Sequence, residues 1–141
     1  MCRIYAAVVT AIALLLSGCH FFIRDSVLAD LDGDGISERI EMRTLGKELQ
    51  IKVNVGSLKK ESQVLSFGID PSRQDAVCSL PVELTTTPSD CTPDAFGTDS
   101  EPLEGCKASA RSQDVMLSDD NCDPIVLYWN HDTRKVWWWR L

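Results

Sequence analysis

The sequence is short of the residues on which several large classes of protein depend. Its 14 Lys and Arg residues are outnumbered by 21 Asp and Glu residues, giving a formal net charge of −7, and such an acidic chain is a poor partner for nucleic acid, which needs basic clusters. It has only two histidines, His20 and His131, so a Ser or Cys nucleophile would have few candidates for its base. No C-x-x-C motif is present, and neither a zinc ribbon nor a thioredoxin-like site is indicated. We therefore expect no nucleic-acid partner and no enzymatic activity.

What the sequence does contain is the composition of one small exported domain. The chain has 141 residues, of which 44% are hydrophobic and 25% are charged, and these values are ordinary for one globular unit. Six cysteines are many for this length, and disulfides persist mainly in oxidising compartments. The compartment therefore depends on what the N-terminus encodes.

The N-terminus has the features of an export signal. After Arg3, residues 4–16 form an uncharged apolar run, which suits a signal sequence and is shorter than the roughly 20 residues that cross a bilayer. Residues 16–19, with the sequence LSGC, resemble the bacterial lipobox. The resemblance implies that residues 1–18 are a lipoprotein signal peptide and that Cys19 is lipidated as the first residue of the mature chain.

The cysteine count agrees with lipidation of Cys19. Cleavage at that site removes Cys2, and a lipid on Cys19 then leaves an even number of cysteines, which can all pair. The alternative is an ordinary secretory signal, with Cys19 as one more disulfide cysteine. The lipobox resemblance also implies that the protein is attached to a membrane through lipid. Because the residue after Cys19 is His20 and not the Asp that favours retention at the inner membrane, the expected location is the periplasmic face of the outer membrane. Residues 19–29 are expected to form the anchored N-terminus and first strand, and residues 21–23 could touch the lipid interface or enter the core.

The strongest chemical signal is the acidic stretch DLDGDGISE at residues 30–38. Carboxylates at alternate positions converge when the backbone coils into a tight loop, and hard oxygen ligands in this number suit calcium. An acidic surface turn that needs no ion is the alternative, although aspartates packed this closely repel one another without a cation. The expected ligands are four side chains and one backbone carbonyl, that of the isoleucine: Asp30, Asp32, Asp34, Ile36 and Glu38.

The residues after this loop predict strands instead of the helices of an EF-hand. The loop matches the EF-hand formula with Glu41 in the last place, but that motif lies between two helices. Apolar and polar residues alternate around Ile40 and Met42 and again over residues 49–55. This alternation predicts a β-hairpin with its turn at residues 45–48.

A calcium loop that leads directly into a strand resembles the FG-GAP or VCBS-type loop of integrin-like and bacterial surface proteins. In that family an apolar stretch leads into D-x-D-x-D-G-x-x-D and then a strand; here residues 27–29 precede the motif, and Glu38 replaces the usual Asp. The family repeats this unit around a propeller, whereas this chain has one copy of about thirty residues. The resemblance therefore implies the local loop and a structural calcium ion, and not the whole fold.

Residues 70–112 are predicted to be mostly loop, tied down by disulfides. The stretch is rich in Pro, Ser, Thr and Asp, which favour turns, and residues 80–84 are expected as an edge strand because Pro81 cannot donate to a ladder. The expected disulfide cysteines are Cys78, Cys91, Cys106 and Cys122. Three pairings are open, of which the one with two short loops, Cys78–Cys91 and Cys106–Cys122, is slightly favoured.

The C-terminus is expected to be an aromatic hairpin. Residues 125–129 and 135–141 are apolar runs separated by turn residues. Because side chains alternate along a strand, Trp137 and Trp139 should face one side and Trp138 the other. One side must be core, while the other packs under loops or offers Trp to a partner. The possible binding residues are Tyr128, Trp129, Trp137, Trp138 and Trp139.

Together these features predict that residues 30–141 form a single all-β domain, a small antiparallel sheet or sandwich of six or seven strands with long disulfide-tied loops. The favoured function is a non-catalytic, calcium-stabilised structural or binding module of the cell envelope, whose partner is an envelope protein or a glycan. A glycan- or peptidoglycan-binding module that uses the C-terminal Trp face is the alternative. A hydrolase acting through paired carboxylates is the third.

Overall fold

The computed structural model describes residues 26–55, 62–92 and 101–140, and these residues form nine β-strands without a helix. Within this part of the chain no helix is therefore long and apolar enough to cross a membrane. The expected signal peptide, Cys19 and residues 21–23 lie outside the described residues.

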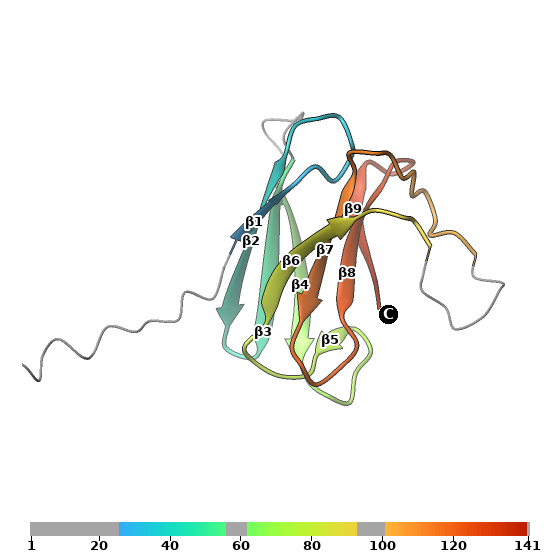
Figure 1. Ribbon diagram of the computed structural model, residues 1–141. Helices are drawn as coiled ribbons and strands as arrows, with labels where there is room; N and C mark the ends of the chain where they lie inside the picture. The colour runs from blue at the N-terminus through green and yellow to red at the C-terminus, as the bar shows by residue number, and fades with distance from the viewer. Residues whose placement is uncertain (1–25, 56–61, 93–100, 141) are drawn as a thin grey trace, which may run out of the picture.

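The first sheet is built around the hairpin predicted from alternation. Its strand order is β1-β2-β3-β4-β5 (Figure 1), with every pair antiparallel except β4 and β5. Leu45 pairs with Glu48 across the turn, where Gly46 has a φ of +61° that suits glycine. The strands are β1 (Ser26–Ala29), β2 (Glu38–Leu45), β3 (Glu48–Asn54), β4 (Ser62–Ile69) and β5 (Ala76–Val77).

The second sheet contains the C-terminal hairpin and has the antiparallel order β6-β7-β8-β9. Its strands are β6 (Glu83–Pro88), β7 (Gln113–Ser118), β8 (Ile125–Asn130) and β9 (Lys135–Arg140). The edge strand expected at residues 80–84 is present as β6 but begins later in the sequence. Pro81 therefore lies before the ladder, where its missing N–H is not needed.

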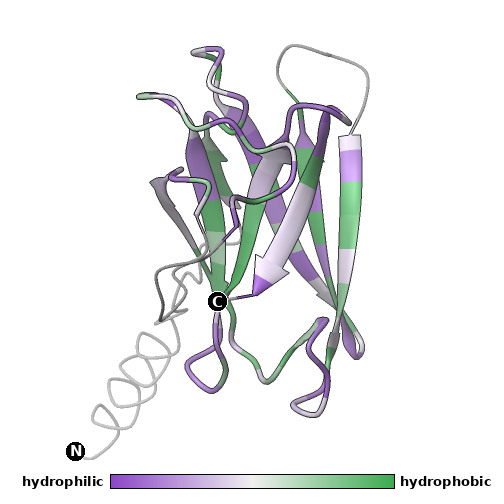
Figure 2. Cartoon of the chain, turned by 90° about the vertical axis from the view of Figure 1, so that its right-hand side faces the viewer, coloured by the Kyte–Doolittle hydropathy of each residue, from purple (hydrophilic) through white to green (hydrophobic). Residues whose placement is uncertain are grey.

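The two sheets pack face to face and enclose one core. Ile40, Ile51 and Phe67 from the first sheet and Leu117 and Leu127 from the second are at most 2% exposed and belong to one cluster. Buried and exposed residues alternate along β2 and much of β3, as period-two patterning requires, whereas β8 is buried along its whole length; the colours of Figure 2 show how apolar residues are distributed over the strands. The all-β prediction is confirmed. Six or seven strands were expected, and the described residues hold nine. The two-residue β5 has no alternation of its own, and the apolar run at residues 115–117 in β7 is too short to predict a strand by itself.

Two disulfides tie the loops, but their pairing differs from the favoured one. The bonds are Cys78–Cys122 and Cys91–Cys106, with Cα–Cα distances of 6.0 and 5.6 Å. The pairing of Cys78 with Cys91 and of Cys106 with Cys122 was therefore wrong. The prediction that these four cysteines form two disulfides is confirmed.

The error arose because nearness in sequence ignored the strands between the cysteines. β6 lies between Cys78 and Cys91, and β7 lies between Cys106 and Cys122. A strand of six residues spans about 20 Å, whereas disulfide-bonded Cα atoms lie within about 7 Å of each other. Each cysteine therefore pairs with one at its own end of the sheet.

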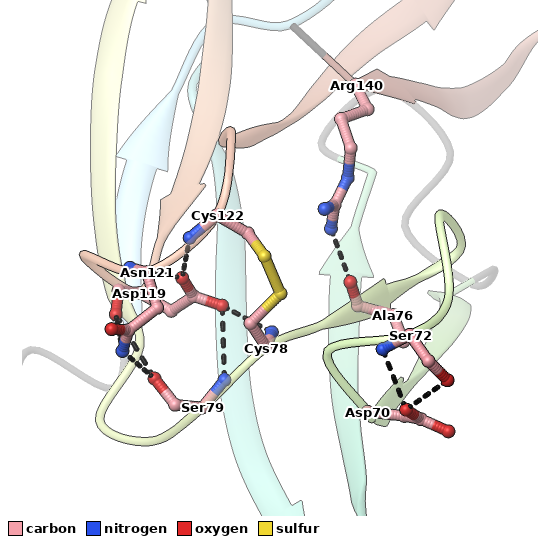
Figure 3. Close-up of a disulfide and its surroundings, with 9 residues drawn as sticks. All are labelled: Asp70, Ser72, Ala76, Cys78, Ser79, Asp119, Asn121, Cys122 and Arg140. Carbon is pink, nitrogen blue, oxygen red and sulfur yellow. Dashed lines mark hydrogen bonds between the residues drawn. A yellow bond between two sulfur atoms is a disulfide. The ribbon is translucent and has the colours of Figure 1, made fainter.

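Asp119 forms hydrogen bonds with both loops that the Cys78–Cys122 disulfide connects. Its carboxylate accepts hydrogen bonds from the backbone N–H groups of both bonded cysteines, Cys78 and Cys122, and from those of Ser79 and Asn121 (Figure 3). Burial acts to raise the pKa of Asp119, but these hydrogen bonds outweigh it and leave the pKa below its usual value. The side chain therefore organises the connection between two loops.

The disulfide pairing can be tested by peptide mapping without reduction. Cleavage after Glu83, Glu104 and Lys107 by Glu-C and trypsin places each cysteine on a separate peptide. We expect residues 74–83 to be linked to residues 112–134 in the mass spectrum. A link from residues 74–83 to the peptide that contains Cys91 would contradict the structure.

Candidate metal site

The acidic loop connects β1 to β2, with its two ends buried and its middle exposed. Asp30 follows β1 and is 8% exposed, and Glu38 opens β2 and is 1% exposed, whereas Asp34 lies at the exposed turn. Gly33 and Gly35 have φ values of +75° and +91°, a region that glycine enters without strain. These two glycines allow the chain to coil between the buried ends.

Carboxylates inside the loop hold this coil by accepting backbone hydrogen bonds. The N–H of Leu31 donates to Glu38 Oε2 at 2.8 Å, and the N–H of Gly35 donates to Asp30 Oδ2 at 2.9 Å. Asp32 and Asp34 each accept from the N–H two residues later, at 3.1 and 2.7 Å. Such Asx turns let short acidic side chains shape a tight loop.

Three of the predicted ligands meet at one point. Asp30, Asp32 and Glu38 each offer a carboxylate oxygen, and these oxygens lie within 4.8 Å of one another. Asp34 is not part of this group, because it is exposed and its Oδ1 accepts from Ile36 N–H. Ile36, whose backbone carbonyl was the fifth expected ligand, is 53% exposed. The structure therefore gathers three of the predicted carboxylates and leaves that of Asp34 outside the cluster.

The cluster holds negative charge that the described residues do not fully satisfy. Asp30 Oδ1 is buried and has no hydrogen-bond partner among them. Burial raises the pKa of Asp32, the charges of Asp34 and Asp30 raise it further, and the Asp34 N–H and His131 act in the opposite direction. A divalent cation bound by these oxygens would supply the missing partner and relieve the repulsion.

The loop is also attached to the second sheet. Asp30 exchanges two hydrogen bonds with Gln113 at the start of β7: Gln113 N–H donates to the Asp30 carbonyl at 2.9 Å, and Asp30 N–H donates to Gln113 Oε1 at 3.3 Å. A Cβ on Gly33 would lie 2.6 Å from Ser109 Oγ. These contacts join segments about eighty residues apart. Local sequence periodicity does not predict contacts between such distant segments, so the roles of Gln113 and Ser109 were not predicted.

The aromatic residues are divided between the two faces of the second sheet. Trp138 faces the first sheet, where its ring packs edge-on against Phe67 with centroids 5.6 Å apart, and it is 37% exposed. Trp137 and Trp139 lie on the outer face and are half-buried, whereas Tyr128 and Trp129 are buried. The five residues therefore do not form a single binding surface.

A scan of the chain against protein-family models finds no matching family, and searches of curated proteins and of solved structures find no significant match.

Proposed function

We propose that this protein is a lipid-anchored, non-catalytic module of the cell envelope whose β-sandwich is stabilised by calcium. The observation that carries the proposal is the cluster of Asp30, Asp32 and Glu38, together with the buried Asp30 oxygen that has no hydrogen-bond partner among the described residues. Carboxylate oxygens are the ligands that calcium prefers, and loop carbonyls and water complete its coordination of 6–8 oxygens. Buried carboxylates are stabilised when a cation neutralises them.

The position of the cluster favours a structural role for the ion. Asp30 follows β1, Glu38 begins β2, and Gln113 connects the same loop to β7. A cation at this point would hold three strands of two sheets at one end of the sandwich. Its affinity need only be modest, because extracellular calcium modules work at about 10⁻⁴–10⁻³ M.

The proposed anchor is the lipidated Cys19. Removal of residues 1–18 takes away one basic residue, Arg3, and leaves the mature chain with a side-chain charge of −8 (13 − 21). An anionic membrane surface repels such a domain, so attachment requires the lipid chains, which hold firmly when there is more than one.

The anchor is tested by replacing its cysteine in cells of a bacterium that makes lipoproteins. We expect the wild-type chain to incorporate an alkyne analogue of palmitate and to fractionate with membranes, because Cys19 carries the lipid. Cys19→Ser should remove the label, whereas the matched control Cys2→Ser should keep it. Processing of the wild-type chain without label would instead indicate an ordinary secretory signal.

The second candidate function is a glycan-binding module. The observation that favours it is that Trp137 and Trp139 lie on the outer face of the second sheet and not in the core. Half-buried indole rings outside a core are often used to contact partners. This candidate is compatible with the calcium loop, which lies elsewhere on the sandwich.

A further inference from the structure

A hollow of about 130 Å³ lies on the outer face of the second sheet. Met116 and Val126, which pair across β7 and β8, line it together with Trp139 of β9 and Asp114 of β7. Residues 87–92, which end β6 and lead into the Cys91–Cys106 loop, contribute Thr87 and Asp90. The lining thus combines apolar, hydroxyl and acidic side chains.

Two of the lining residues carry buried polar atoms without a hydrogen-bond partner in the described part of the chain. They are Asp114 Oδ1 and Trp139 Nε1. The first accepts a hydrogen bond and the second donates one. Since buried polar groups are nearly always paired in native proteins, two complementary unpaired atoms on one hollow point to a ligand.

Asp114 is kept in this position at a cost to the fold. It is 5% exposed, and its pKa is raised to about 6, mainly by burial and also by the charge of Asp90, although a hydrogen bond with Ser89 acts to lower it. A neutral residue at this position in the sheet would destabilise the folded state less, because no charge would have to be buried. Perturbed carboxyl groups at such positions are commonly functional.

We propose that this hollow binds a hydroxyl-bearing edge of a neutral sugar ring, which rests on the glycan-binding candidate and names its site. Sugar hydroxyl groups can both donate, as Asp114 Oδ1 requires, and accept, as Trp139 Nε1–H requires, so a sugar offers partners of the right kind for the two unpaired atoms. The indole and the apolar side chains of Met116 and Val126 would contact the C–H face of the ring. The volume admits one edge of one ring, with the rest of a glycan outside.

The charge of the lining separates this ligand from others. Of the residues that the structure describes, no Lys, Arg or His lines the hollow, whereas Asp90 and Asp114 do, so phosphates and acidic sugars are repelled. An alkylammonium group would suit Asp114 but would leave the Trp139 N–H unpaired. Neutral sugars are therefore favoured over both.

The test is an NMR titration of the mature chain, residues 19–141, in a detergent without sugar groups. The chain has four tryptophans, so its indole N–H signals report separately on each ring, and Trp139→Phe assigns the relevant one. We expect chitobiose or maltose to shift the Trp139 signal. Asp114→Asn should weaken the apparent affinity at least tenfold, whereas Asp123→Asn, which removes an exposed carboxylate, should leave it unchanged.

Each other result would overturn a defined part of the proposal. Shifts confined to other indole signals would retain glycan binding but refute this site, and no shift with either sugar would refute both. A stronger response to methylammonium or to galacturonic acid would assign the hollow to a charged ligand. Cleavage of the disaccharide would contradict the non-catalytic function, and none of these outcomes affects the calcium loop.

Discussion

Saturating calcium should raise the midpoint of thermal unfolding of the mature chain by about 10 °C relative to chelator-treated protein. An ion that binds only the native state stabilises it by about 2.7 kcal/mol at one hundred times its dissociation constant, and each kcal/mol shifts the midpoint of a domain of this size by several degrees. The cluster of Asp30, Asp32 and Glu38 provides the differential binding, because the unfolded chain does not bring these oxygens together. Differential scanning calorimetry with calcium and with chelator measures the shift.

Asp32→Asn isolates the contribution of the site. Asparagine keeps the Oδ1 that accepts from Asp34 N–H and removes one charge. We expect the calcium-dependent shift to fall to about a quarter of the wild-type value, while the chelator-treated variant unfolds at a higher temperature than the chelator-treated wild type, because repulsion raises the pKa of Asp32. Asp123→Asn is the control for removal of a charge elsewhere. Equal calcium shifts in wild type and Asp32→Asn would contradict the site.

Asp114→Asn should stabilise the protein at neutral pH by about 3 kcal/mol and leave its stability at pH 4 nearly unchanged. The pKa of Asp114 is raised from 3.8 to about 6 in the fold, and each unit corresponds to about 1.4 kcal/mol. Since the folded-state pKa is higher than the unfolded one, the unfolded chain loses its proton first. The stability contribution of the protonated group is therefore present below about pH 4 and is lost as pH rises through about 6.

The measurement is denaturant unfolding of the wild type and the variant from pH 4 to pH 8. The difference between the two curves isolates Asp114 from carboxyl groups that act in the opposite direction, such as Asp119 and Asp70, whose pKa values are lowered. We expect the difference to grow between pH 4 and pH 7 and then level off. Parallel curves would show that Asp114 is not buried as a charged group.

The hairpins could be predicted from the sequence because their signals are local. Ile40 and Met42 alternate with polar residues on one side of Gly46, and Ile51 and Val53 alternate on the other; all four face the core. Alternation fixes which face is buried, and a glycine-containing turn fixes the register. The same reasoning placed Trp138 on the face opposite Trp137 and Trp139.

The disulfide pairing could not be predicted in this way because it depends on which strands are neighbours in the second sheet. Cys78 and Cys122 are 44 residues apart, and the antiparallel pairing of β6 with β7 brings the β5–β6 and β7–β8 connections to one end. The Asp30–Gln113 contact and the hollow beside Asp114 are non-local as well. Of the candidate metal site, the spacing of acidic residues identified Asp30, Asp32 and Glu38, but burial was needed to separate them from Asp34.

Isothermal titration calorimetry of calcium into chelator-treated mature chain measures the occupancy of the loop itself. We expect one calcium ion per chain in the wild type and in Asp123→Asn, and binding weakened at least tenfold in Asp32→Asn and Asp30→Asn. Absence of binding heat in the wild type at millimolar calcium, or an unchanged isotherm in the two loop variants, would show that Asp30, Asp32 and Glu38 do not form a calcium site.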